Sequence, residues 1–232
     1  MEQGRKVYAV IVAAGSGSRF GANLPKQFCL LCGRPVVMTA IERMRQSIPN
    51  VQLRLVLSDS FLTQWQEMCD EHGFESPQIV VGGSTRWESV KNALTSIPAI
   101  SSKDIVLVHD AARPLMTARV AERLIAALDS GFDGAVPVVP VVDSIREIQQ
   151  DGSSVAVDRS KYRAVQTPQA FLLEDLRQAY ELPFSPLMTD DASVMEAYGR
   201  TNVALVEGEN SLMKITRPGD MEYMEYFLKT QQ

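Results

Sequence analysis

The first 140 residues alternate between two hydrophobic periods, one typical of buried strands and one typical of helices. A short apolar run rich in β-branched residues predicts a strand at 7–12, and further short apolar runs predict strands at 51–57, 78–81, 105–109 and 134–138. Apolar positions three and four residues apart predict helices at 35–48, 61–72, 85–97 and 120–128. Regular alternation of strands and helices is typical of an α/β fold, so we expect a three-layer, mostly parallel, Rossmann-like sheet.

Residues 140–163 break this rhythm. Polar and apolar positions alternate on both sides of Asp151-Gly152, a dipeptide favoured in hairpin turns, so we expect a projecting β-hairpin here. Its apolar residues are too few to bury within one subunit, and a lone hairpin is marginally stable. The hairpin either folds back on its own domain or packs as an arm on a second subunit, and we favour the arm.

Helix and strand signals resume after the hairpin, with helices expected at 190–198 and 218–228 and strands at 203–206 and 213–216. A chain of 232 residues, 45% of them hydrophobic, can bury a full core. We therefore expect a single domain over 1–232, with 140–163 inserted in it as a dimerisation arm that forms a homodimer.

The overall charge and hydropathy exclude some partners. A net charge of −5 provides no general positive field for a nucleic acid polymer. The sequence has no apolar run of about 18 residues, and the first residues precede a core strand and not a signal-peptide core. We expect a cytoplasmic protein with no membrane partner.

A loop of small residues follows the first predicted strand. Side chains this small let backbone N–H groups approach an anion closely, and the residues concerned are Ala13, Ala14, Gly15 and Gly17. Arg19 and Lys26 add two cations to the same loop, so the loop suits a triphosphate.

Other readings of this loop fit less well. A dinucleotide-binding fingerprint needs glycine where Phe20 stands, and a P-loop needs Gly-Lys-Ser/Thr, whereas Gly21 lies five residues before Lys26 and Gln27 follows it. A glycine-rich turn without chemical consequence is the plain alternative. The cations and the Pro25-Lys26-Gln27 sequence argue against it.

Cys29 and Cys32 have the spacing of redox and zinc sites. A zinc site would need two more ligands, and the chain offers only Cys69, His72 and His109. The pair also lies in an apolar stretch and not at a predicted helix start. We expect small buried thiols that pack as hydrophobic side chains.

Further polar residues follow the ends of predicted strands, where ligands bind in open α/β sheets. Asp110 and Arg113 stand three residues apart after the strand at 105–109, either as a structural ion pair or as groups that hold a ribose or polyol hydroxyl or a metal. Gly82-Gly83 and Ser89 can form a base pocket, or simply a turn before a capped helix.

The loop AAGSGSRFG with the later PKQ resembles the signature of the sugar-phosphate nucleotidyltransferases, and within them the 2-C-methyl-D-erythritol 4-phosphate cytidylyltransferase family. Matching segments recur in the family's order along nearly the whole chain. They are GGSTRWESV at 82–90, VHDAARP at 108–114, DR at 158–159, QTPQAF at 166–171, TDDAS at 189–193 and KITRPGD at 214–220.

The resemblance implies an enzyme of the non-mevalonate pathway to isoprenoids, which transfers CMP from CTP to 2-C-methyl-D-erythritol 4-phosphate. It implies catalytic roles for Arg19, Lys26, Arg159 and Lys214. The nucleotide would contact Ala13, Ala14, Gly15, Gly17, Gly82, Gly83, Ser89, Asp110 and Ala111. The polyol and its phosphate would contact Asp110, Arg113, Ser144, Arg159, Thr167, Thr189 and Lys214. One departure is Asp143-Ser144, where the family commonly has Asp-Thr; serine keeps the hydroxyl.

Nucleotidyl transfer needs alignment and charge stabilisation more than covalent help from the protein. We therefore expect direct in-line attack by the substrate phosphate, with Mg²⁺ (or another divalent cation) held mainly by the CTP phosphates and no protein metal ligands. Two alternatives remain open at this point. One is a ribitol 5-phosphate cytidylyltransferase, which shares the first loop, and the other is a nucleotide-binding module without turnover, which would have no need for Arg159.

Overall fold

The computed structural model describes residues 5–15, 24–98 and 101–230, and a mixed eight-stranded sheet runs through it. The strand order is β10-β7-β11-β6-β1-β4-β5, and β12 pairs with β7 outside this path. The bounds are β1 Val7–Val12, β4 Gln52–Leu57, β5 Gln78–Val81, β6 Ile105–Asp110, β7 Gly134–Pro140, β10 Arg163–Val165, β11 Gln169–Leu172 and β12 Val203–Glu207.

The core of the sheet is parallel, as the sequence predicts. Strand β1 pairs in parallel with β4 and β6, β4 with β5, and β7 with β12. The exception is β11, which lies antiparallel between β6 and β7, with β10 antiparallel at the far side of β7. The carboxyl ends of β1, β4 and β6 therefore meet at one edge, where polar loops follow them.

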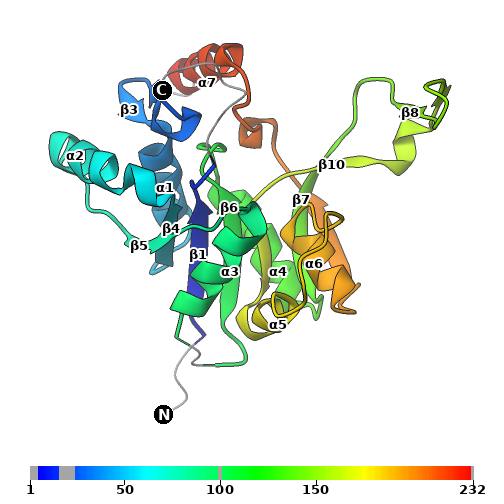
Figure 1. Cartoon of the computed structure of the whole chain (residues 1–232), viewed down its shortest axis with the longest axis horizontal. Coiled ribbons are helices and arrows are strands. Elements are labelled where there is room, and N and C mark those ends of the chain that lie inside the picture. The colour runs from blue at the N-terminus through cyan, green and yellow to red at the C-terminus, as the bar shows by residue number, and fades with distance from the viewer. Residues whose placement is uncertain (1–4, 16–23, 99–100, 231–232) are drawn as a thin grey trace.

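Helices cover both faces of the sheet (Figure 1). Residues along β1 alternate between these faces, because Ala9 and Ile11 join one buried cluster while Tyr8 and Val10 join the other. The first cluster includes α1 Val36–Ser47, α2 Leu62–His72 and α4 Ala118–Asp129, and the second includes α3 Arg86–Ser96, α5 Leu173–Ala179 and α6 Asp191–Ala197. Within the described ranges, no helix is long and apolar enough to span a membrane. The expected three-layer α/β fold is confirmed.

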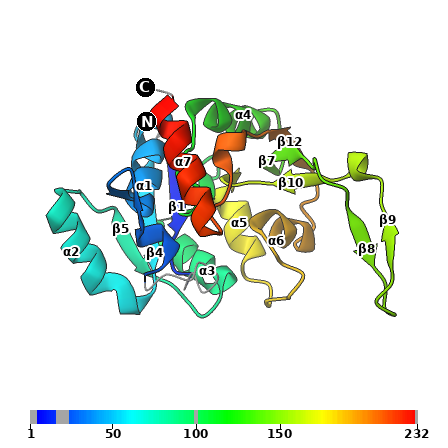
Figure 2. The same ribbon diagram turned by 90° about the horizontal axis from the view of Figure 1, so that it is seen from above.

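A β-hairpin projects from the body of the molecule (Figures 1 and 2). Its strands are β8 Arg146–Ile148 and β9 Ser154–Ala156, joined through a turn in which Gly152 has φ of 81°. This left-handed conformation favours glycine. The predicted hairpin around Asp151-Gly152 is therefore present.

The C-terminal segment differs from the prediction. The residues at 213–216 form no strand; they continue from a 3-10 turn at Asn210–Leu212 toward α7 Pro218–Thr230. The prediction rested on alternating apolar positions in this segment. The apolar residue Ile215 is indeed buried, but it belongs to a cluster with Leu31 of β2 (Leu30–Leu31) and Met224 of α7. One backbone bond, from Ile215 N to Ala112 O at 2.9 Å, ties this segment to the loop after β6.

The cysteines are less buried than expected. Cys69 is buried, but Cys29 is half-buried and Cys32 is exposed. Cys32 has φ of 51° in the tight turn between β2 and β3 (Arg34–Pro35), and this turn places its side chain outside the core. Among the residues that the structure describes, no cluster of His, Cys, Asp and Glu is placed to hold a metal ion.

Candidate active site

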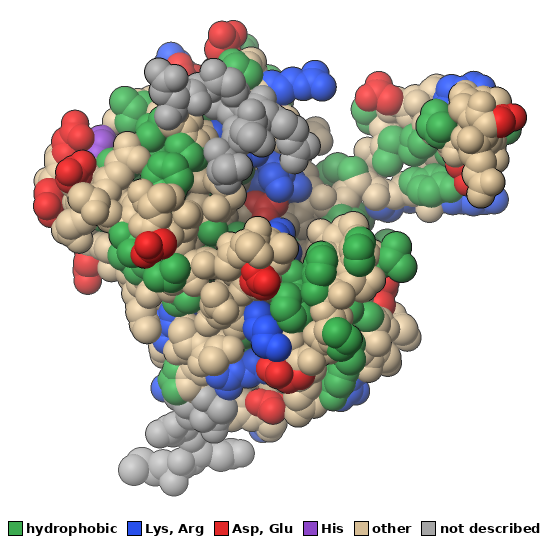
Figure 3. Space-filling model, in the orientation of Figure 1, with side chains coloured by type: hydrophobic (Ala, Val, Ile, Leu, Met, Phe, Trp, Pro, Cys, Tyr) green, Lys and Arg blue, Asp and Glu red, His purple; other side chains and the backbone are tan. Residues whose placement is uncertain are grey.

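A cavity of about 640 Å³ opens at the carboxyl ends of β1 and β6, where the sequence predicts ligand binding. On the face shown in Figure 3, Lys and Arg side chains lie together with an acidic side chain near the middle of the molecule. The cavity is lined by Val12, Ala13, Ala14, Gly15, Lys26, Gln27, Gly83, Ser84, Thr85, Arg86, Ser89, Asp110, Ala111, Ala112, Lys214 and Thr216.

Most of the predicted nucleotide contacts lie in this lining. The structure brings together Ala13, Ala14, Gly15, Lys26, Gly83, Ser89, Asp110, Ala111 and Lys214. Gly17 and Arg19 lie outside the described residues. Of the predicted positions that are described, the lining does not include Gly82, Arg113, Ser144, Arg159, Thr167 or Thr189.

Gln27 anchors the small-residue loop that follows β1. It is buried on a 3-10 turn, Lys26–Phe28, and its amide nitrogen donates to Ala13 O at 2.8 Å and to Gly15 O at 2.7 Å. Both N–H groups of the amide are therefore committed to loop carbonyls. This arrangement fixes the start of the loop beside Lys26, the residue that precedes Gln27 in the chain.

The Gly82-Gly83 turn is packed too closely for larger residues. A Cβ on Gly82 would lie 2.7 Å from Ala14 Cβ and 2.9 Å from Ser89 Oγ. The Ser89 hydroxyl accepts from Gly83 N at 3.1 Å and donates to Thr85 O at 2.8 Å. The serine thus shapes the turn, and its hydroxyl proton is already used within the protein.

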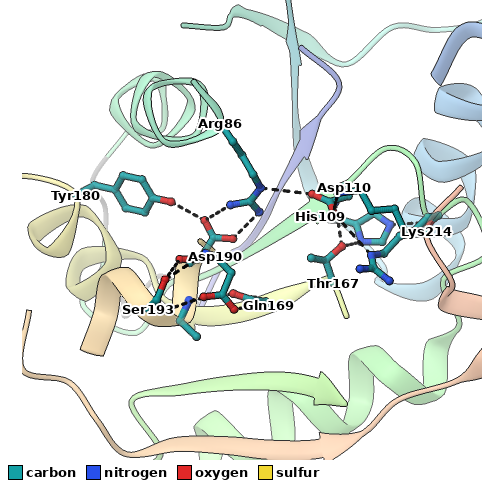
Figure 4. A network of polar contacts seen from close by, with 12 residues as sticks. Arg86, His109, Asp110, Thr167, Gln169, Tyr180, Asp190, Ser193 and Lys214 are labelled. Atoms are coloured by element: carbon teal, nitrogen blue, oxygen red, sulfur yellow. Dashed lines mark hydrogen bonds and ion pairs between the residues drawn. The ribbon is translucent and has the colours of Figure 1, made fainter. Parts of the chain in front are cut away.

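Asp110 is surrounded by positive charge (Figure 4). Lys214 Nζ lies 2.9 Å from one carboxylate oxygen and Arg113 Nε 3.7 Å from the same oxygen, while Arg86 Nε lies 3.5 Å from the other. Burial alone would raise the pKa of the Asp110 carboxyl, but these cations outweigh it and hold its pKa well below the usual range. The carboxylate is therefore ionised wherever the protein is folded near neutral pH.

The three cations are held differently. Arg113 is mostly buried and donates to Leu212 O at 2.7 Å, so it is anchored in the wall behind Asp110. Lys214 has a side chain that is 40% exposed and reaches Asp110 through a single ammonium group. Lys214 is therefore the cation best able to turn toward a ligand in the cavity.

His109 and Thr167 lie behind Asp110. The Thr167 hydroxyl accepts from Asp110 N at 3.0 Å, and His109 lies between this hydroxyl and Arg113 O. Burial lowers the pKa of His109 to about 4, so the imidazole is neutral at physiological pH. Thr167 is buried in the wall and not in the described lining, so it acts on Asp110 more directly than on a ligand.

Sequence reasoning missed Arg86 and Asp191. Arg86 begins α3 after a capping box formed by Thr85 and Glu88, and Asp191 begins α6 after one formed by Asp190 and Ser193. Arg86 donates to both oxygens of Asp191, at 3.1 and 2.7 Å. Both residues lie in segments that match family motifs, but only the fold shows that they meet.

A smaller cavity of about 160 Å³ adjoins the first, and Arg86 lines both. Thr189 lies in this second cavity with Trp87 and Tyr180. Thr189, which the sequence predicts to contact the substrate phosphate, therefore lies beside the main cavity and not in its lining.

The predicted residues of the arm lie on the projecting segment. Ser144 and Arg159 are exposed, and Arg159 donates to Val142 O within the same arm. The chain's own cavity lining does not contain them within the described residues.

Known proteins resemble this chain over nearly its whole length. The family model described as 2-C-methyl-D-erythritol 4-phosphate cytidylyltransferase matches residues 7–230. The 2-C-methyl-D-erythritol 4-phosphate cytidylyltransferase of Bacteroides fragilis is 42% identical, covering 92% of this chain and 95% of that protein. Its namesake from Porphyromonas gingivalis strain W83 is also 42% identical, covering 98% of this chain and 99% of that protein.

Solved structures agree with these relatives. A 4-diphosphocytidyl-2C-methyl-D-erythritol synthase from Anaerococcus prevotii matches with a TM-score of 0.79 at 25% identity, covering 98% of this chain and 100% of that one. The 2-C-methyl-D-erythritol 4-phosphate cytidylyltransferase of Thermus thermophilus matches with a TM-score of 0.71 at 31% identity, covering 97% and 99%. This chain therefore belongs to the 2-C-methyl-D-erythritol 4-phosphate cytidylyltransferase family.

Proposed function

We propose that the protein, in this cavity, transfers CMP from CTP to 2-C-methyl-D-erythritol 4-phosphate, which gives 4-diphosphocytidyl-2-C-methyl-D-erythritol and pyrophosphate. This is the reaction of the family to which the chain belongs, a step of isoprenoid precursor synthesis. The observation that carries the proposal is the convergence of Lys26 and Lys214 on a cavity that begins at the small-residue loop after β1. Two cations facing a backbone cradle suit a triphosphate and an attacking phosphate.

Each cation has a proposed role. The substrate phosphate attacks the α-phosphorus of CTP in line, and pyrophosphate leaves without a covalent enzyme intermediate. Lys26, with Arg19 of the same loop, stabilises the negative charge that develops on the α-phosphate oxygens. Lys214 leaves Asp110 to position the attacking phosphate, and Asp110 then accepts hydrogen bonds from ribose or polyol hydroxyls.

We propose that a divalent cation such as Mg²⁺ binds mainly to the CTP phosphates. Asp110 is the only carboxylate in the described cavity lining, and its oxygens already face Arg86, Arg113 and Lys214. Such a site does not form a dense acidic cage, and Mg²⁺ commonly keeps several waters when it binds nucleotide phosphates. The cation would supply charge neutralisation, while the protein side chains align the reacting groups.

The arm is proposed to complete the active site of a second subunit. Its exposed apolar side chains include Val142 at 76%, Ile148 at 70% and Val155 at 47% exposure, and contact with a second subunit would remove this apolar surface from water. Hydrophobic side chains are also visible on the arm in Figure 3. If the arm crosses a two-fold axis, Ser144 and Arg159 reach the partner's phosphate site.

Pyrophosphate release tests the reaction. We expect purified protein to release pyrophosphate from CTP and 2-C-methyl-D-erythritol 4-phosphate, and to do so far more slowly with ribitol 5-phosphate or with UTP. Faster turnover of ribitol 5-phosphate would favour the alternative cytidylyltransferase. Tight CTP binding without turnover of either polyol phosphate would favour a binding module.

Subunit mixing tests the arm separately. Lys26→Ala and Arg159→Ala proteins are each expected to be inactive, and their heterodimers hold one doubly altered site and one intact site if the arm crosses over. Random exchange makes about half of the dimers mixed, so activity should recover toward roughly a quarter of wild type. Demonstrated subunit exchange without recovered activity would show that each site is built within one chain.

A further inference from the structure

Arg86 lies between two carboxylates, one at the cavity and one buried beside it (Figure 4). Its two terminal nitrogens donate to Asp191, and its Nε lies 3.5 Å from Asp110 Oδ1. Asp191 has no exposed side-chain surface, whereas Arg86 is 30% exposed. The guanidinium thus connects a buried anchor with a carboxylate that faces the ligand cavity.

The anchor holds Arg86 firmly. Asp191 also accepts from the Tyr180 hydroxyl at 2.6 Å, and Trp87 stacks on the Tyr180 ring with a centroid distance of 5.5 Å. A paired, buried carboxylate fixes the planar guanidinium through two parallel hydrogen bonds. Because both terminal nitrogens are used there, Arg86 cannot turn toward a phosphate without leaving a buried charge unpaired.

Lys214 contrasts with Arg86. Both contact Asp110, but Lys214 is flexible and is the cation that the proposed reaction draws toward the substrate phosphate. Once Lys214 turns away, Asp110 keeps only Arg86 and Arg113 among its described partners. An incompletely paired carboxylate would repel the phosphates and would also compete with them for Lys214.

We propose that Arg86 is a positioning residue of the transfer reaction, held by Asp191 and Tyr180 so that it orients and neutralises Asp110 while Lys214 binds phosphate. This inference rests on the proposed function. Arg86 does not itself contact the reacting atoms. It acts through Asp110, and Asp191 acts through Arg86.

The test must separate this role from simple stabilisation. Replacing Arg86 alone would leave Asp191 as a buried, unpaired charge, which is strongly destabilising. The double variant Arg86→Gln with Asp191→Asn removes both charges: asparagine matches aspartate in shape, and glutamine is shorter than arginine but keeps an amide group that can donate hydrogen bonds. We expect it to keep the wild-type circular dichroism spectrum and a similar Tm, but to lose kcat/KM for the polyol phosphate by roughly 10- to 100-fold, as for one charge-assisted contact.

A third substitution distinguishes an effect through Asp110 from a purely structural effect of Arg86 on activity. Adding Asp110→Asn to the double variant removes the charge that Arg86 is proposed to neutralise. The triple variant should therefore be no less active than Asp110→Asn alone. If the double substitution instead costs the same factor with Asn at position 110 as with Asp, Arg86 does not act through Asp110 and the proposal is wrong.

Two further proteins keep the experiment decisive. Arg86→Lys retains a positive charge for Asp191, yet one ammonium group cannot bind both oxygens of Asp191 and face Asp110. It should show a similar loss of kcat/KM, and it decides the question if the double variant does not fold. The matched control is Arg200→Gln. Arg200 also bridges two carboxylates, because its terminal nitrogens lie 3.6 Å from Asp133 Oδ1 and 3.3 Å from Asp175 Oδ1. None of these three residues belongs to the described cavity lining.

Wild-type kinetics in a folded double variant or in Arg86→Lys would overturn the inference. The wild-type protein is assayed alongside with CTP and the polyol phosphate. Absence of pyrophosphate release from wild type would contradict the proposed function itself. Release by wild type and by the folded variants at equal rates would contradict only the role of Arg86.

Discussion

The imidazole of His109 fixes the direction of its hydrogen bond with Thr167. His109 Nε2 lies 2.9 Å from Arg113 O, which can only accept, so Nε2 carries the proton of the neutral ring. Nδ1 is then unprotonated and accepts from the Thr167 hydroxyl at 3.2 Å. The hydroxyl oxygen in turn accepts from Asp110 N, so the Thr167 proton is not available for a substrate phosphate.

Thr167→Val should destabilise the protein more than Thr167→Ser. Valine preserves the volume but leaves Asp110 N–H and His109 Nδ1 unpaired in a buried site, at about 1–3 kcal/mol each, whereas serine keeps both bonds. Urea unfolding of the two variants measures the difference. Equal stabilities would show that the hydroxyl is not required for this wall of the site.

The stability of the protein should fall between pH 7 and pH 5 because of His109. The pKa of this histidine is lowered by burial from 6.5 to about 4, so the unfolded chain binds its proton more readily than the folded protein in that range. Stability therefore rises with pH between the two values, and the loss on acidification from pH 7 to pH 5 should be about 2 kcal/mol. Chemical unfolding at several pH values measures it.

A variant at this histidine provides the control for the pH dependence. His109→Asn removes the titrating imidazole, so it should be less stable than wild type at pH 7 but should lose less stability on acidification. If His109→Asn follows the wild-type curve, His109 is not the group that titrates.

Lys26→Ala should reduce kcat by roughly 10²–10³-fold, the usual loss for one group that stabilises developing charge. A partly exposed cation contributes little to folding, so Tm should change by no more than a few degrees. Steady-state kinetics and thermal unfolding provide the two measurements. Lys103→Ala, in the loop before β6, is the matched control, and wild-type turnover of pure Lys26→Ala protein would remove Lys26 from the mechanism.

Gly82→Ala should weaken CTP binding without abolishing folding. The added methyl would clash with Ala14 and Ser89, which both line the cavity. The turn at Gly82 and the start of the loop after β1 would therefore have to move apart. We expect the KM for CTP to rise by roughly 5- to 150-fold, the equivalent of about 1–3 kcal/mol of overpacking. Gly219→Ala in α7, where a Cβ would meet nothing within 4 Å, should leave that KM unchanged.

The fold could be predicted where local pattern and packing agree. The runs at β1, β4 and β6 are short and mostly apolar, and each is buried between helices on both faces, so a local pattern is sufficient. The sequence pattern does not predict strand β11 or helix α5, although β5 and α6 are equally short and are predicted. The place of β11 depends on antiparallel pairing with β6 and β7, which no local period encodes.

The site could be predicted where one loop carries several functional groups. Lys26 and the glycines of the first loop are close in sequence, so the order of residues by itself indicates their chemistry. The contact of Arg86 with Asp191 joins positions that are 105 residues apart, and each position alone resembles an ordinary helix start. Only the topology brings them to the same wall.

The segment that follows the hairpin, residues 163–167, connects the arm directly to the wall of the cavity. The chain leaves the hairpin, pairs with β7 at Val165 and reaches Thr167 two residues later, beneath Asp110. One run of five residues, 163–167, therefore forms both the base of the arm and part of the wall behind Asp110. A deletion of the arm that extends into this run would remove the hydrogen bond between Thr167 and Asp110 together with the hairpin, so a shortened protein tests the arm alone only if the deletion ends before Arg163.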